Sequence, residues 1–164
     1  GRRRHVRIGV YPETKHPTYF DSIGLSLEEP LAAALCRHHL DRPNAPVFVQ
    51  PFETANLREL DTLVRVPVVQ LVDASGAPYD LVAAGETTTY RDLVTPAGLR
   101  EVATYAEGVG TNKDLVLPRD AAGAVGAPSP VAKGDVRAEI FASPLSLGCP
   151  LAGYSSGIRI QATR

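Results

Sequence analysis

The sequence predicts an α/β fold in which the strands run parallel, and three observations lead to this class. Strand-like and helix-like segments alternate through the first 110 residues, as they do in successive βαβ units. Residues 66–72 (VPVVQLV) are apolar in succession, which is typical of a strand buried on both faces. No GxGxxG follows the first strand-like segment, which argues against a dinucleotide-binding doubly wound sheet. Since a (β/α)8 barrel has about 250 residues, we predict a partial TIM (β/α)8-type barrel.

The first unit joins a strand to a helix. Residues 6–13 (VRIGVYPE) contain β-branched and aromatic side chains and are expected to form the first strand with its exit loop. Residues 25–40 repeat apolar side chains at helical spacing. Ser26 and Glu29 have the spacing of a capping box, so we expect this helix to begin at Ser26.

The next units repeat this order. Residues 47–52 (VFVQPF) predict a second strand, and residues 57–64 predict a second helix on a 3–4 apolar spacing. Residues 73–90 predict a long polar loop, which is a candidate functional insertion. Thr95, followed by proline, predicts the start of a third helix. Residues 108–110 (GVG) return the chain to the sheet.

The pattern weakens after residue 117. Residues 121–130 (AAGAVGAPSP) predict a linker, and residues 136–140 predict a short helix. We therefore divide the chain into a partial barrel at residues 1–120 and an irregular C-terminal segment at residues 121–164.

Composition limits the possible partners. The formal net charge of −1 argues against a nucleic-acid-binding surface. No apolar run reaches the length of a transmembrane helix, and the N-terminus has no signal-peptide pattern. An incomplete barrel leaves open strand edges, so we also expect possible self-association.

Glu13 and Lys15 lie two residues apart at the C-terminal end of the first predicted strand, so their side chains should point the same way. Barrel enzymes build their active sites at this end. A carboxylate there could bind Ca²⁺ or Mg²⁺, and a lysine could balance phosphate charge. The spacing alone fits an ordinary surface ion pair equally well.

Residues 9–20 (GVYPETKHPTYF) closely resemble the motif that follows a middle barrel strand in glycerophosphodiester phosphodiesterases, especially those of the periplasmic or secreted branch. Residues 47–52 (VFVQPF) and 68–72 (VVQLV) resemble the next two strands of that family. Residues 105–118 (YAEGVGTNKDLVLP) resemble a further strand and its loop. The four segments occur in the family's order and cover about residues 6–120.

The resemblance implies a phosphoric diester hydrolase that converts glycerophosphodiesters to an alcohol and glycerol 3-phosphate with a divalent cation, Ca²⁺ or Mg²⁺. It implies that Glu13 is a metal ligand and that Lys15 contacts the substrate phosphate. It places Gln50 at the rim of the substrate pocket and Lys113 in a family-like loop. It also suggests a periplasmic or secreted location.

The chain departs from the family in one important respect. The ordered set that opens the family (His-Arg-Gly, a Glu-x-Asp metal pair, then a second catalytic histidine) does not occur. His38 and His39 fall on the first predicted helix, where surface histidines are common, whereas His16 follows the metal motif. We therefore assign no catalytic residue and expect a fragment that is inactive alone. A non-catalytic remnant and a small phosphate-ligand binding module are the alternatives.

Overall fold

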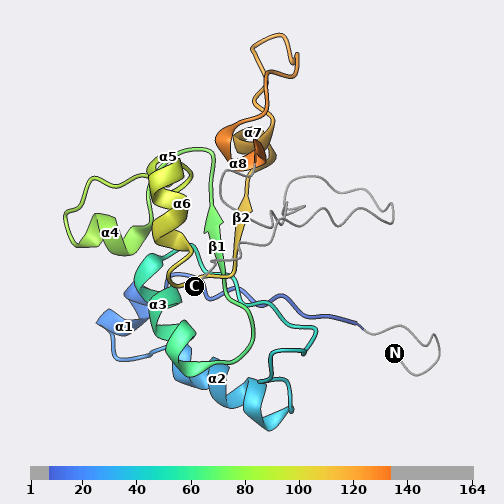
Figure 1. Ribbon diagram of the computed structural model, residues 1–164. Helices are drawn as coiled ribbons and strands as arrows, with labels where there is room; N and C mark the ends of the chain where they lie inside the picture. Colours follow the sequence, from blue (N-terminus) through green and yellow to red (C-terminus); the bar gives the residue numbers. More distant parts are fainter. Residues whose placement is uncertain (1–7, 134–164) are drawn as a thin grey trace.

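The computed structural model describes residues 8–133 of the chain. Short helices and strands alternate along this part, and the strands lie together at its centre (Figure 1). Helix and strand are mixed as an α/β fold requires. The elements are α1 (Pro17–Ser22), α2 (Glu28–Arg37), α3 (Thr54–Leu63), β1 (Val69–Val72), α4 (Tyr79–Ala83), α5 (Tyr90–Leu93), α6 (Pro96–Val102), β2 (Gly108–Thr111), α7 (Lys113–Val116) and α8 (Pro130–Lys133).

The strands run parallel. β1 and β2 pair with Val69 opposite Gly108, and single parallel bridges join Val49 to Val68 and Val10 to Val47. The four strand segments therefore follow one another across the sheet in chain order. Residues 8–133 show this parallel arrangement without closing it into a barrel.

The first two predicted strands are shorter than expected, because each is reduced to isolated bridges. Prolines lie beside every one of these bridges and have no N–H to donate to a ladder. Their carbonyl groups still accept hydrogen bonds across the strands, such as Val10 N–H to Pro46 at 2.8 Å and Gln50 N–H to Pro12 at 2.9 Å. The strand segments therefore pair in parallel through only a few hydrogen bonds each.

The predicted helices are present, but the expected start of the first is wrong. α2 begins at Glu28 with Leu27 as its N-cap and no side-chain cap. The Ser26 hydroxyl donates to the carboxylates of Glu28 and Glu29, two and three residues further on, and accepts a 3.3 Å hydrogen bond from the N–H of Glu28. Thr95 does cap α6, accepting a 3.0 Å hydrogen bond from the N–H of Gly98.

The predicted loop at residues 73–90 is also partly wrong, since it contains α4 and the first residue of α5. Thr89 and Asp92 form a reciprocal capping box at the start of α5. Helices of four or five residues leave too little apolar periodicity to be recognised in sequence. The insertion is therefore an ordered, partly helical segment.

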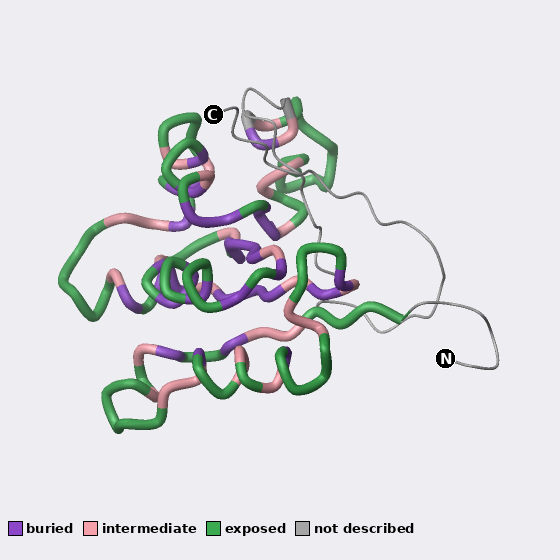
Figure 2. The backbone as a smooth tube through the Cα atoms, turned by 60° about the horizontal axis from the view of Figure 1, so that its bottom comes forward, coloured by how far each residue is buried: buried purple, intermediate pink, exposed green. Residues whose placement is uncertain are grey.

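The core lies where the helices pack against the sheet. All residues of β1 and β2 are buried, and Figure 2 shows buried and exposed stretches alternating along the described backbone. Val131 in α8 belongs to the same core at 1% exposure, whereas residues 121–128 are exposed. The domain boundary at residue 120 stays a prediction, and the helix predicted at 136–140 lies outside the described residues. The most buried apolar residues are Val47, Val49, Leu57, Leu60, Val68, Val69, Leu99, Val102, Val109 and Val131.

None of the helices within residues 8–133 combines the length and the apolar character required to cross a lipid bilayer.

Candidate functional site

A cavity of about 310 Å³ opens where the first three strand segments end. Its walls come from the residues that directly follow the bridge at Val10, the bridge at Val49 and strand β1, together with the insertion that carries α4 and α5. Pockets of this size accommodate small molecules. The lining residues are Glu13, Thr14, Lys15, His16, Phe52, Glu53, Asp73, Tyr79 and Tyr90.

Glu13 and Lys15 lie together in this pocket. The Lys15 Nζ atom is 3.6 Å from Glu13 Oε1, and the lysine side chain is 70% exposed, against 18% for the glutamate. The same Oε1 atom is buried and accepts no hydrogen bond from the described residues. A buried carboxylate oxygen usually has a partner, so this atom is available to a ligand.

Thr14 lies between these two residues and faces the helices. Its hydroxyl donates to Asn56 on α3, and Asn56 in turn donates to the Glu28 carboxylate at the start of α2. Glu28 is only 1% exposed and also accepts from the N–H of Leu27 at 2.9 Å. This chain of buried polar contacts holds the loop that carries the site.

His16 ends the loop with a left-handed backbone, φ 58° and ψ 48°, and Pro17 then begins α1. Histidine is among the non-glycine residues that adopt this conformation most often. The N–H of Thr18, in the first turn of α1, donates a 3.0 Å hydrogen bond to Glu53 Oε2. The turn at His16 thus brings the end of the first strand against the end of the second.

Gln50 lies at the same edge of the sheet as Glu13 but does not line the cavity. It is 7% exposed, and its Nε2 atom donates to the carbonyl of Tyr11 at 3.1 Å. Its Oε1 atom is buried without a hydrogen-bond partner in residues 8–133. A substrate-binding role for Gln50 stays a prediction. Lys113 is exposed at the start of α7 and does not line the cavity.

Six lining residues were not predicted from the sequence: Thr14, Phe52, Glu53, Asp73, Tyr79 and Tyr90. Each ends or follows a predicted strand or lies in the predicted insertion, which is the available signal. The phenol of Tyr90 has its pKa raised to about 12, first by burial and then by the carboxylates of Asp73, Asp80 and Glu53. This side of the cavity is therefore electronegative.

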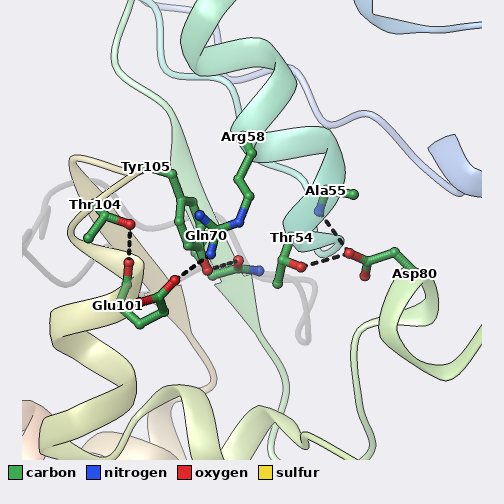
Figure 3. A network of polar contacts seen from close by, with 8 residues as sticks. All are labelled: Thr54, Ala55, Arg58, Gln70, Asp80, Glu101, Thr104 and Tyr105. Carbon is green, nitrogen blue, oxygen red and sulfur yellow. Dashed lines mark hydrogen bonds and ion pairs between the residues drawn. The ribbon is translucent and has the colours of Figure 1, made fainter. Parts of the chain in front are cut away.

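Asp80 attaches the insertion to α3. Its Oδ2 atom accepts 2.7 Å hydrogen bonds from the Thr54 hydroxyl and from the N–H of Ala55, so it caps the α3 N-terminus from a distant segment (Figure 3). The same view shows Arg58 over the Tyr105 ring, 4.1 Å from its centroid, and bound to Glu101. These contacts join α3 to α4 through Asp80, and to α6 and Tyr105 through Arg58.

The described residues do not make a complete cation site. No group of three or more His, Cys, Asp or Glu side chains in residues 8–133 is placed to hold a metal ion. Ca²⁺ and Mg²⁺ are coordinated by six or more oxygens, several of which can be water or phosphate. The Oε1 atom of Glu13, which accepts no hydrogen bond from the described residues, fits one position of such a set. The Glu-x-Asp spacing at Glu59 and Asp61 lies on exposed positions of α3, outside the cavity.

No protein-family model matches the sequence. Over 125 residues the chain is 25% identical to glycerophosphodiester phosphodiesterase GDPD6 of Arabidopsis thaliana, an alignment that covers 68% of this chain. The similarity is distant. The alignment covers 32% of the plant protein, so the chain spans about a third of that relative's length.

The cavity brings three kinds of functional group together in one loop. The cavity offers a carboxylate oxygen without a hydrogen-bond partner in the described residues, an exposed ammonium group and a histidine within one loop, Glu13 to His16. Such a set can bind an anionic ligand and a cation together. Among the described residues it offers a single histidine, so it does not supply a pair of histidines as general acid and general base.

Proposed function

We propose that this chain forms part of the active site of a glycerophosphodiester phosphodiesterase, a hydrolase that releases an alcohol and glycerol 3-phosphate. The proposal rests mainly on the Glu13–Lys15 pair, which lies in a cavity at the carboxyl ends of parallel strands. The distant similarity to the plant phosphodiesterase supports the choice of reaction. In this proposal the strands of residues 8–133 are part of a (β/α)8 barrel, whose active sites occupy that end.

Lys15 is proposed to bind the substrate phosphate. Its ammonium group is mostly exposed and 3.6 Å from Glu13, so a phosphate can approach it without breaking a buried ion pair. A positive charge at this place opposes the charge that accumulates on the phosphoryl oxygens. Removing it should weaken phosphate binding without disturbing the fold.

Glu13 is proposed to contribute one carboxylate to a Ca²⁺ or Mg²⁺ site. Its buried Oε1 atom has no hydrogen-bond partner in residues 8–133, and a cation would satisfy it. When bound, such a cation would supply charge neutralisation at the phosphate. Because one carboxylate holds these ions weakly, phosphate oxygens and water are expected to complete the coordination.

Calorimetric titration with glycerol 3-phosphate, with and without Mg²⁺, tests the proposal. Binding should strengthen when Mg²⁺ is present, and Glu13→Gln should remove that dependence. Lys15→Met should weaken binding about tenfold, the usual cost of losing one hydrogen bond to a charged group. Glu86→Gln is the matched control, because Glu86 is exposed and outside the cavity. Equal binding by the wild type and Glu13→Gln at every Mg²⁺ concentration would contradict the proposal.

Turnover gives an independent test. General acid–base catalysis, most often by histidine, contributes about 10²- to 10⁴-fold, and within residues 8–133 His16 is the one histidine that lines the cavity. The purified 164-residue chain should therefore release no measurable glycerol 3-phosphate from glycerophosphocholine with either cation. Robust cation-dependent release would show that the residues assigned here are an incomplete account of the site.

A further inference from the structure

His16 precedes α1 in a backbone conformation that is unusual at the start of a helix. N-cap residues are usually extended, as Thr89 and Thr95 are before α5 and α6, whereas His16 is left-handed with φ 58°. Within residues 8–133 His39 is the other non-glycine residue with a positive φ, and it ends α2 in a hydrogen-bonded turn, where this conformation is common. Helix geometry therefore explains His39 but not His16, and uncommon backbone conformations cluster at functional sites.

The imidazole of His16 has no structural task among the described residues. It does not cap α1; the carboxylate of Glu53 takes that place and accepts a 3.0 Å hydrogen bond from the N–H of Thr18. It forms no ion pair with a carboxylate of residues 8–133. The residue is exposed and lines the cavity directly after Lys15. Its side chain is therefore available to a ligand that enters the cavity.

Acidic groups outnumber basic ones around His16. The other titratable groups that line the cavity come from the same loop, the ends of the next two strands and the insertion: Glu13, Lys15, Glu53, Asp73, Tyr79 and Tyr90. Three of these are carboxyl groups, which repel a phosphate, and one is an ammonium group, which attracts it. Histidine changes its charge between about pH 5 and pH 8. His16 is thus the one other described residue of the lining that can carry a positive charge toward the phosphate.

We propose that His16 is a second phosphate-contacting residue, which binds the phosphodiester as an imidazolium beside the ammonium group of Lys15. The inference rests on the proposed function, in which Lys15 holds the phosphate. Both ring nitrogens of an imidazolium are donors, so it adds a charge-assisted hydrogen bond to a phosphoryl oxygen. The affinity for the phosphodiester then falls as the pH rises and the imidazole loses its proton.

The test needs a ligand whose own charge stays constant. A phosphate monoester changes its charge near pH 6, so the 164-residue chain is titrated with the diester glycerophosphoglycerol in Mg²⁺. The wild type should bind about threefold to tenfold more tightly at about pH 6 than at about pH 8, between the effects of an exposed ion pair and of a charged hydrogen bond. His16→Asn should bind at both pH values as the wild type does at the higher one, because asparagine tolerates the left-handed backbone and takes up no proton.

Two further variants serve as controls. His16→Lys supplies a permanent positive charge and should bind tightly at both pH values. His39→Asn removes the other left-handed histidine, which is exposed and outside the cavity, and should keep the pH dependence of the wild type. Persistence of the pH dependence in His16→Asn or in His16→Lys, or its loss in His39→Asn, would overturn the assignment of His16.

The outcomes separate this inference from the function beneath it. Lys15→Met should weaken binding at both pH values, because its charge does not depend on His16. Binding that requires Mg²⁺ and Lys15 but is equal at the two pH values would overturn the role of His16 and leave the phosphodiesterase proposal standing. Failure of the diester to bind the wild type at either pH would overturn both.

Discussion

The hydroxyl of Thr14 donates a 2.6 Å hydrogen bond to Oδ1 of Asn56, and both side chains are buried. Thr14 lies between Glu13 and Lys15 and also lines the cavity, so its contact with α3 fixes the loop that carries the site. Asn56 lies on α3 and donates to Glu28 at the start of α2. The candidate site is thus held by two helices through buried polar contacts.

Thr14→Val keeps the shape of the side chain and removes the donor. The Asn56 oxygen would lose its partner in a buried place, which should lower the free energy of unfolding by about 1–3 kcal/mol. Chemical denaturation measures the change. Thr62→Val is the control, because Thr62 is exposed on α3, and it should change stability by less than about 0.5 kcal/mol. An unchanged free energy of unfolding in Thr14→Val would show that this contact does not hold the loop.

The predicted order of strands and helices came from patterns that depend on burial. The apolar run at 66–72 and the 3–4 spacing at 57–64 predicted β1 and α3 because both elements face the core. The short helices α1 and α4 were missed because four to six residues carry no measurable period. The capping box of Thr89 and Asp92 was a usable signal for α5 that the prediction overlooked.

The candidate site was predicted in its first loop only. Glu13 and Lys15 lie two residues apart, so local geometry was sufficient to place their side chains together. Glu53, Asp73 and Tyr79 reach the cavity through the parallel order of strands and the path of the insertion. Such long-range placement depends on tertiary packing, which residue spacing does not specify.

Asp80 is expected to stabilise the insertion through α3. Asp80→Ala removes two hydrogen bonds at the α3 N-terminus, from Thr54 and Ala55, and should cost about 2 kcal/mol. Amide exchange should accelerate at Ala55 and in α4 before it does in β1. Asp61→Ala, an exposed change on the same helix, should leave exchange there unaltered. Unchanged protection at Ala55 in Asp80→Ala would argue against the capping contact.

Stability should depend on pH through Glu107. Burial raises the pKa of its carboxyl above the ordinary 4.5, although the N–H of Val68 donates to it at 2.8 Å and opposes the shift. The folded state then binds the proton more tightly than the unfolded state. Stability from this group is therefore full below the ordinary pKa and is lost as pH rises through the raised pKa.

Glu107→Gln tests that sign, since glutamine does not titrate and still offers Val68 an acceptor. The variant should gain stability relative to the wild type at neutral pH, and the gain should shrink toward about pH 4. Denaturation curves at both pH values give the difference. If the stability gained by Glu107→Gln instead grows as the pH falls, the pKa of Glu107 is not raised in the folded state.

The outer edge of the first strand segment is expected to drive self-association. Ile8 is 72% exposed and Val10 is 46% exposed, and within residues 8–133 no strand pairs with that edge. Ile8→Lys should shift the chain toward monomer in sedimentation velocity, because charge on an edge strand opposes pairing. Ile23→Lys, at a similarly exposed residue beyond α1, should not. A compact wild-type monomer at high concentration would contradict this expectation.

The most direct test of the central claim maps where a cation and a phosphate meet on the chain. Mn²⁺ accepts the same oxygen ligands as Mg²⁺ and broadens nearby amide signals in NMR spectra. In the presence of glycerol 3-phosphate, Mn²⁺ should selectively broaden the amides of Thr14, Lys15 and His16, and Glu13→Gln should abolish the effect. Broadening that is uniform, lies elsewhere, or survives Glu13→Gln would contradict the assignment of this cavity as a phosphodiesterase site.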